Sequence, residues 1–77
     1  MENLLDVRLY RCPLPVLKTR KALEALPIGA ELTVLATDPA ARIDMAHFCA
    51  MSGHALLSAQ ETDGVLRFVL RKGPPRC

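Results

Sequence analysis

The sequence predicts an α/β (α+β) two-layer sandwich, in which a four-stranded mixed sheet carries two helices on one face. Three observations lead to this prediction. Two segments with helical spacing each begin at a proline, four short segments with strand-like apolar patterns lie around them, and an Asp-Gly pair near the C-terminus indicates a hairpin. The resulting order is βαβαββ, and right-handed crossovers place both helices on one side of the sheet.

The first strand is expected over residues Asn3–Val7, followed by a loop from Arg8 to Arg11. The first helix is expected from Pro13 to about Leu26, because apolar residues recur there at helical spacing and proline is well tolerated in a first helical turn. The run Pro27–Gly29 stops this helix. Its apolar positions are Val16, Leu17, Leu23 and Leu26.

The middle of the chain predicts a strand followed by the second helix. Residues Glu31–Thr37 alternate in the manner of a strand with one buried side, on which Leu32, Val34 and Ala36 lie. Asp38 is then a good N-cap, and Pro39 fits the first helical position. An apolar stripe follows, formed by Ala41, Met45, Phe48, Cys49 and Ser52, until Gly53 ends the helix.

Two further strands are expected at residues His54–Gln60 and Val65–Arg71. The four residues between them end in Asp63-Gly64, which is a strong hairpin signal. The core-facing positions of the last strand are Leu66, Phe68 and Leu70. The other face of the sheet is expected to be exposed, with Thr33, Leu35, Val65 and Val69 on it.

Length and composition limit the functions open to the chain. Its 77 residues make one domain, and 51% hydrophobic with 23% charged residues indicates a compact globule. No apolar run is long enough to cross a membrane and no basic leader precedes one, so we expect a cytoplasmic protein without a membrane partner. The net charge of +2 is too small to imply nucleic-acid binding.

Cys12 directly precedes the first predicted helix, and this position makes it a candidate nucleophile. The start of a helix has unpaired N–H groups and a partial positive charge, which stabilise a thiolate. With Cys12 as the N-cap, we expect its Sγ to accept from Leu14 N–H, since Pro13 and Pro15 have no N–H to offer. Such surroundings lower the pKa of a thiol below its ordinary value of about 8.5. The alternative is a small buried apolar residue.

Basic residues crowd the first third of the chain, around Cys12. They are Arg8, Arg11, Lys18, Arg20 and Lys21. We expect Arg11 and Lys18 to support the thiolate, and Arg8, Arg20 and Lys21 to guide an acidic protein partner toward it. The alternative is an ordinary solvated helix face.

The other cysteines and the histidines favour ordinary structural roles. Cys49 lies on an apolar stripe and is expected to be buried, whereas Cys77 ends a tail, residues 73–77, that has no pattern and is expected to be mobile. Three widely spaced cysteines do not form a disulfide framework, which fits a reducing compartment. His47 and His54 lack the paired spacing of zinc ligands, so we expect no metal. No phosphate-binding glycine loop or catalytic triad is present, so we expect no cofactor and no enzymatic turnover.

The motifs of this chain resemble those of the TusA and SirA family of small sulfur carriers, which is marked by a Cys-Pro-x-Pro element. The matching features, in family order, are Leu5-Asp6, Arg11–Pro15, Lys18, Leu26-Pro27-x-Gly29, Ala36–Pro39, Asp44, Phe48-Cys49, Gly53-His54 and Gly64-x-x-x-Phe68. On this resemblance, residues 1–72 form a single sulfur-carrier domain and residues 73–77 a flexible tail.

The resemblance implies that Cys12 carries sulfane sulfur as a persulfide. The sulfur comes from a cysteine desulfurase or a rhodanese-like donor and passes to an acceptor protein in tRNA thiolation, sulfur oxidation or cofactor biosynthesis. Pro13 and Pro15 shape the start of the helix on this reading, and Asp6 belongs to the matching leader.

Two positions depart from the family pattern. Leu9 stands where members often have glycine, so we expect the loop to bend differently or to lean harder against the core. Leu14 stands where the best-known tRNA-pathway members have an acidic residue, which leaves the pathway open.

Two other functions remain open from the sequence. The first is a regulatory or RNA-contacting module that uses the basic residues as an electropositive patch. The second is a redox-active thiol protein, which the absence of Cys-x-x-Cys disfavours. We expect a monomeric carrier, whose donor and acceptor proteins supply the catalysis.

Overall fold

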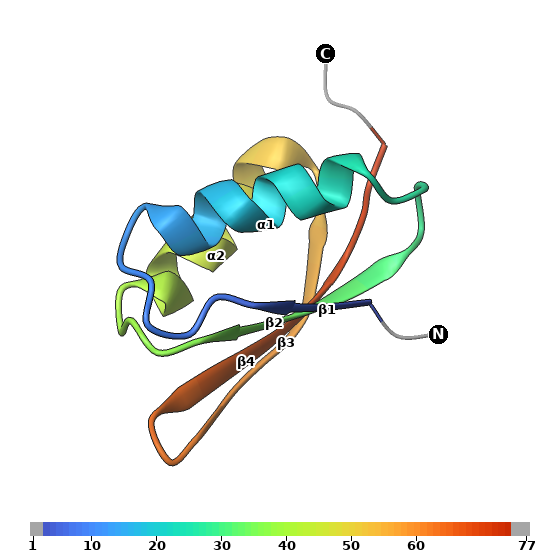
Figure 1. The fold of residues 1–77 in the computed structure, drawn as a ribbon. Coiled ribbons are helices and arrows are strands. Elements are labelled where there is room, and N and C mark those ends of the chain that lie inside the picture. Colours follow the sequence, from blue (N-terminus) through green and yellow to red (C-terminus); the bar gives the residue numbers. More distant parts are fainter. Residues whose placement is uncertain (1–2, 75–77) are drawn as a thin grey trace.

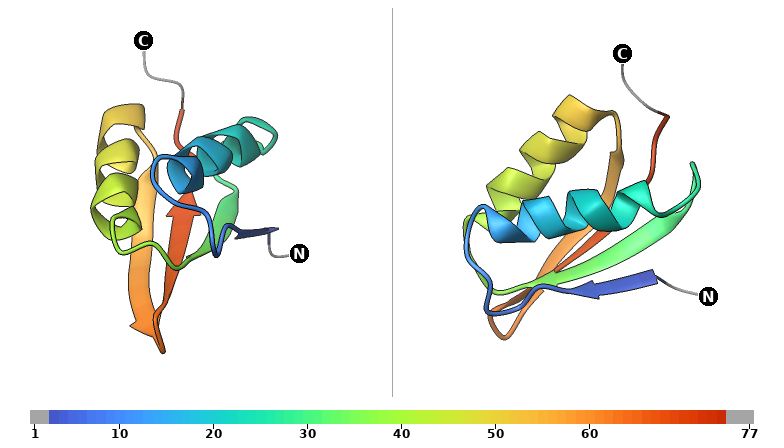
Figure 2. Two further views of the ribbon diagram at one scale, coloured as in Figure 1. Left: turned by 60° about the vertical axis from the view of Figure 1, so that its left-hand side comes forward. Right: turned by 45° about the horizontal axis from the view of Figure 1, so that its top comes forward.

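The computed structural model of the chain describes residues 3–74. Its elements are β1 (Asn3–Asp6), α1 (Leu14–Glu24), β2 (Glu31–Ala36), α2 (Ala41–Ser52), β3 (Ala55–Thr62) and β4 (Val65–Arg71). The strands form one sheet in the order β1-β2-β4-β3, with β1 parallel to β2 and the other neighbours antiparallel. Both helices cover the same face of this sheet (Figures 1 and 2). The predicted βαβαββ order and mixed sheet are confirmed.

The core lies between the sheet and the two helices. Its buried apolar residues are Val7, Leu23, Leu32, Val34, Ala36, Ala41, Met45, Phe48, Cys49, Leu66, Phe68 and Leu70. The predicted inward faces of β2 and β4 are confirmed by this set. Among residues 3–74, no helix has both the length and the apolar character needed to cross a membrane.

Helix α1 starts one residue later than predicted. Three of its four predicted apolar positions lie against the core, with Leu23 buried and Val16 and Leu26 partly buried. Its interior side is formed by Pro15, Thr19 and Leu23, which are four residues apart and therefore lie one above the other. The Thr19 hydroxyl donates to the Pro15 carbonyl oxygen at 2.7 Å, so its burial leaves no unpaired polar group. Leu17 is 50% exposed, so the prediction that it faces the core is wrong.

Helix α2 also starts later than predicted, with Ala40 rather than Asp38 at the N-cap. Asp38 instead forms the turn before the helix, where its Oδ1 accepts from Ala40 N–H at 3.0 Å. The predicted apolar stripe is buried from Ala41 to Cys49, and its last member, Ser52, is half-buried. Gly53 ends the helix with a φ of 79°, as expected of a left-handed C-terminal residue.

The hairpin between β3 and β4 is tighter than predicted, because β3 continues to Thr62. Only Asp63 and Gly64 form the turn, with φ values of 51° and 80°. Positive φ at both central residues matches the strand twist of a two-residue hairpin. At the opposite end of β4, His54 Nδ1 accepts from Gly73 N–H at 3.0 Å. Residues 75–77, including Cys77 of the predicted mobile tail, lie outside the described residues.

The uncovered face of the sheet is less exposed than predicted. Thr33 is only 8% exposed, and Leu35, Val65 and Val69 are half-buried. Thr33 lies on an inner strand, with Leu4 and Val69 opposite it on the two neighbouring strands, and a position flanked on both sides is less open to solvent than one on an edge strand.

Candidate functional site

Cys12 is exposed on the loop between β1 and α1, directly ahead of the helix. The predicted capping bond is not formed. Pro13 is the N-cap of α1, the Cys12-Pro13 peptide bond is cis, and no side chain caps the helix. Leu14 N–H donates to the Arg11 carbonyl oxygen at 2.8 Å and not to the thiol. The side chain that acts most strongly on the pKa of the Cys12 thiol belongs to another part of the chain.

The thiol borders an apolar groove between the start of α1 and the length of α2. The groove is lined by Cys12, Pro13, Val16, Asp44, His47, Phe48, Met51 and Ser52. Asp44 contributes the one carboxylate of this lining, and His47 its one imidazole. The tertiary structure therefore brings an acidic side chain of α2 to the predicted nucleophile.

The pKa of Cys12 is raised above its ordinary value, which is opposite to the prediction. The largest cause is a hydrogen bond with the Asp44 side chain, followed by partial desolvation and by the negative charges of Asp44 and Asp38. Nearby carboxylates disfavour a thiolate because like charges repel. We predicted that the helix start, Arg11 and Lys18 lower the pKa of this thiol. That prediction is wrong, because the charges that act most on the thiol are acidic.

Asp38 ties the Cys12 loop, which we define as residues 7–13, to the start of α2. Its Oδ2 accepts from Cys12 N–H at 2.6 Å, while its Oδ1 accepts from Ala40 N–H. These two bonds lower the pKa of the Asp38 carboxyl, because they stabilise its charged form. The sequence indicated Asp38 as a helix cap, but its bond to Cys12 joins two distant segments and could not be found from local pattern.

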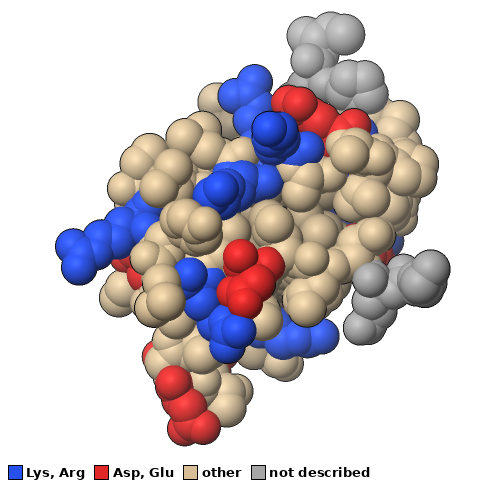
Figure 3. Space-filling model, in the orientation of Figure 1, with Lys and Arg blue, Asp and Glu red and all other residues tan. Residues whose placement is uncertain are grey.

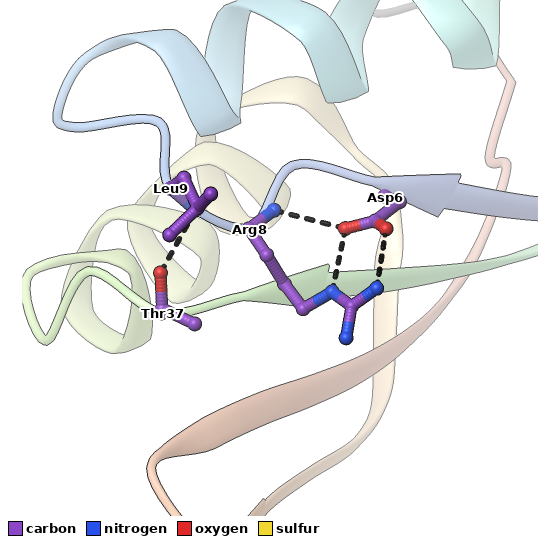
Figure 4. Close-up of polar contacts among 4 residues, drawn as sticks. All are labelled: Asp6, Arg8, Leu9 and Thr37. Atoms are coloured by element: carbon purple, nitrogen blue, oxygen red, sulfur yellow. Dashed lines mark hydrogen bonds and ion pairs between the residues drawn. The ribbon is translucent and has the colours of Figure 1, made fainter.

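Leu9 has a left-handed backbone, with a φ of 74°, and its side chain is 90% exposed. Its N–H donates to Thr37 Oγ1 at 2.9 Å, which fixes the bend of the Cys12 loop against the end of β2 (Figure 4). The left-handed region favours glycine. The chain therefore makes a glycine-type bend with a leucine, and that leucine points to solvent instead of leaning against the core.

Asp6 and Arg8 form a tight pair at the end of β1 (Figure 4). The Arg8 guanidinium donates from Nε and Nη2 to the two Asp6 oxygens at 2.9 and 2.8 Å, and Arg8 N–H donates to Oδ1 at 3.0 Å. These bonds lower the pKa of Asp6 to about 2. Asp6 thus fixes the turn that leads into the Cys12 loop, and Arg8 is held by Asp6 and is not a free docking residue.

The predicted basic collar is not a continuous patch. Arg20 Nε lies 3.9 Å from Glu24 Oε1, and Lys18 Nζ lies 4.7 Å from the centre of the Tyr10 ring. In Figure 3, Lys and Arg side chains are scattered over the face shown and have acidic side chains among them. Arg11 and Lys21 are exposed. The loop, helix α1 and the groove instead present exposed apolar side chains, namely Leu9, Tyr10, Leu14, Leu17 and Met51.

Cys49 contrasts with Cys12, as the sequence predicted. It is a free thiol, 3% exposed, in the core face of α2. Burial alone raises its pKa to about 11. Within residues 3–74, no group of three histidine, cysteine or acidic side chains is placed to hold a metal ion.

The family model described as Sulfurtransferase TusA matches residues 3–72. The chain belongs to the TusA family. The TusA match covers the sheet, both helices and the Cys12 loop, so the site described above lies entirely within the matched segment.

Similar proteins agree with this TusA assignment. A proposed sulfur carrier protein of Neisseria meningitidis serogroup A is 49% identical over 67 residues, covering 87% of this chain and 90% of that protein. The sulfur carrier protein TusA of Pseudomonas entomophila is 41% identical over 68 residues, covering 88% and 85%. The crystal structure of a SirA-like protein from Desulfitobacterium hafniense superposes with a TM-score of 0.80 at 27% identity, over 92% of this chain and 97% of that one.

Proposed function

We propose that the chain carries sulfane sulfur as a persulfide on Cys12. The observation that supports this most is the position of the thiol, which is exposed on a loop held by side chains of neighbouring segments. A carrier needs a sulfur atom that two different active sites can reach in turn, and Cys12 meets this need while Cys49 is enclosed. Membership of a sulfur-carrier family supports the same role.

The proposed loading step moves one sulfur atom without net oxidation or reduction. The Cys12 sulfur attacks the terminal sulfur of a donor persulfide, using its own electron pair for the new S–S bond. The donor S–S bond breaks, and its electron pair leaves with the donor cysteine, which takes up the proton that Cys12 gives up. The products are a Cys12 persulfide and a donor thiol, and delivery repeats this exchange on an acceptor.

The proposed partners are proteins in the cytoplasm: a cysteine desulfurase or rhodanese-like donor, and an acceptor that serves tRNA thiolation, sulfur oxidation or cofactor biosynthesis. The exposed apolar side chains beside the thiol support docking of a protein, because aromatic and apolar groups anchor protein interfaces. Leu14 and Leu17 project from the first turns of α1 and would meet the partner next to Cys12.

The function is tested by incubating the full chain with each donor class and its sulfur source, then recording the intact mass. We expect a gain of about 32 Da, the mass of one sulfur atom, which reducing agent removes. The gain is expected to be lost in Cys12→Ser and retained in Cys77→Ser, the matched control at another cysteine. A gain that survives in Cys12→Ser contradicts the proposal. Steeply salt-dependent RNA binding that is indifferent to Cys12→Ser would instead favour the RNA-contacting function.

A further inference from the structure

Asp44 is placed to control the Cys12 thiol. It lies in the first turn of α2, is half-buried, and lines the same groove as Cys12. No lysine or arginine within residues 3–74 forms an ion pair with it, and Arg42, the basic residue nearest to it in sequence, is paired with Glu61 at 3.1 Å. The same apolar groove therefore brings a thiol together with a carboxylate that has no ion-pair partner among the described lysines and arginines.

The groove around this pair has a simple charge pattern. From α2 it receives Asp44 and His47, while Asp38, in the turn before α2, bonds the Cys12 backbone and Arg11 adjoins Cys12 on its own loop. The rest of the lining is apolar apart from Ser52, and it includes Val16, Phe48 and Met51. Such a groove is complementary to a segment that offers an apolar side chain and a positive charge.

We propose that Asp44 holds the Cys12 thiol in its protonated, unreactive form in the free protein. A lysine or arginine of the sulfur-exchanging partner then enters the groove, pairs with Asp44 and frees the thiol for attack. This inference rests on the proposed function, and it assigns Asp44 as a positioning residue and a cationic side chain as the feature that the partner brings.

The electrostatics of the site support this assignment. The hydrogen bond and the negative charge of Asp44 both raise the pKa of Cys12, so the free protein holds less thiolate than an unperturbed exposed cysteine would. A cation beside Asp44 offsets that charge and so favours the thiolate. Because the thiolate is the form that oxidants attack, this arrangement also protects an exposed cysteine until its partner is bound.

The first test measures alkylation of Cys12 by neutral iodoacetamide between pH 6 and pH 10, with the adducts assigned to each cysteine by peptide mass spectrometry. In Asp44→Asn the inflection is expected to move to lower pH. Alkylation at pH 7 is expected to be about two- to fivefold faster, the range that an exposed charge interaction gives. Asp63→Asn, in the turn between β3 and β4 and outside the groove lining, removes the same charge and should match the wild type.

The second test asks whether Cys12 prefers cationic reagents. The rate of disulfide exchange with cystamine, a dication, is divided by the rate with neutral hydroxyethyl disulfide. We expect the wild type to favour cystamine, high salt to weaken this preference, and Asp44→Asn to reduce it to what the charge of Asp38 alone gives. Asp44→Ser, which also removes the charge, provides the same comparison if the asparagine variant does not fold.

An unchanged inflection and an unchanged cystamine preference in the Asp44 variants would overturn the inference. A slower alkylation at every pH, without a shift of the inflection, would also overturn it by indicating a purely structural role. Neither test uses a sulfur donor. A failure of Cys12 to accept sulfur would therefore refute the proposed function separately.

Discussion

Cys12 and Cys49 are both free thiols whose pKa is raised, but the physical causes differ. The pKa of Cys49 is raised by burial alone, because the thiol is enclosed in the hydrophobic core. Cys12 is exposed, and the first cause of its raised pKa is a hydrogen bond with Asp44. A neighbouring charge can be offset by a binding partner, whereas burial cannot. One thiol is therefore sealed by the fold, and the other is restrained in a way that a partner can reverse.

The two regions are also held differently. Cys49 belongs to a helix that packs on the sheet through apolar contacts. The Cys12 loop is held by two hydrogen bonds to side chains. Asp38 accepts from Cys12 N–H, and Thr37 accepts from Leu9 N–H. Substitutions in the core should therefore have larger effects on the free energy of unfolding than substitutions in the loop.

The largest effect on stability is expected from Phe68→Ala, in the core that encloses Cys49. Phe68 is fully buried, and its truncation should reduce the free energy of unfolding by about 3–5 kcal/mol. Urea denaturation measures this loss, and Ile43→Ala on the exposed face of α2 is the control. Site-resolved alkylation should speed up at Cys49 but not at Cys12. Equal acceleration at both thiols would mean that the two regions are not separate, and Phe68→Leu makes the same comparison with a smaller perturbation.

Cys49→Ser is expected to have the next largest effect. A hydroxyl in place of this buried thiol should cost about 1–3 kcal/mol of stability, because the new polar group is taken from water into the core. Thermal unfolding measures the cost. Sulfur acceptance at a temperature where the variant is folded should equal that of the wild type. A large loss of acceptance would show that Cys49 takes part in sulfur transfer.

Leu9→Gly tests the backbone strain in the Cys12 loop and is expected to have a smaller effect on stability than the core substitutions. Glycine relieves the left-handed backbone and removes a side chain that is already in solvent, so we expect a gain of about 0.5–1 kcal/mol. Leu17→Gly, inside α1 and also exposed, is the matched control and should lose a similar amount. Loss of stability in Leu9→Gly would show that Leu9 makes contacts that outweigh its backbone strain.

The smallest effect is a pH dependence from the pair of Asp6 and Arg8. The pKa of Asp6 is about 2 in the folded protein and about 3.9 for an unfolded aspartate, so the folded state favours the charged form. The stabilisation is present above the unfolded value and is lost as the pH falls toward 2. Between pH 5 and pH 2, the Tm should therefore fall less in Asp6→Asn than in the wild type. The Asp63→Asn control should follow the wild type, and parallel curves for all three proteins would refute a specific role for the pair.

Local patterns predicted the fold and the accessible cysteine, but not the chemistry around it. The stripe from Ala41 to Cys49 and the Asp63-Gly64 turn depend on neighbours in sequence, and both were found. Of the four apolar positions predicted for α1, Leu23 is buried and Val16 and Leu26 pack against the core, whereas Leu17 is exposed. The burial of Thr19 was missed, because it depends on the bond of its hydroxyl to the Pro15 carbonyl oxygen. The acidic surroundings of Cys12 come from α2 and from Asp38 before it, and only the packing of the two helices brings them together.

The central claim is that sulfur is carried by the accessible thiol and by no other. The most direct measurement is site-resolved mass spectrometry of the wild-type chain after a single round of loading with a limiting amount of donor persulfide, with Cys49 as the internal control. The account predicts added sulfur on Cys12 and none on Cys49. Sulfur found on Cys49, or on neither of these two thiols while the chain as a whole gains mass, would contradict it.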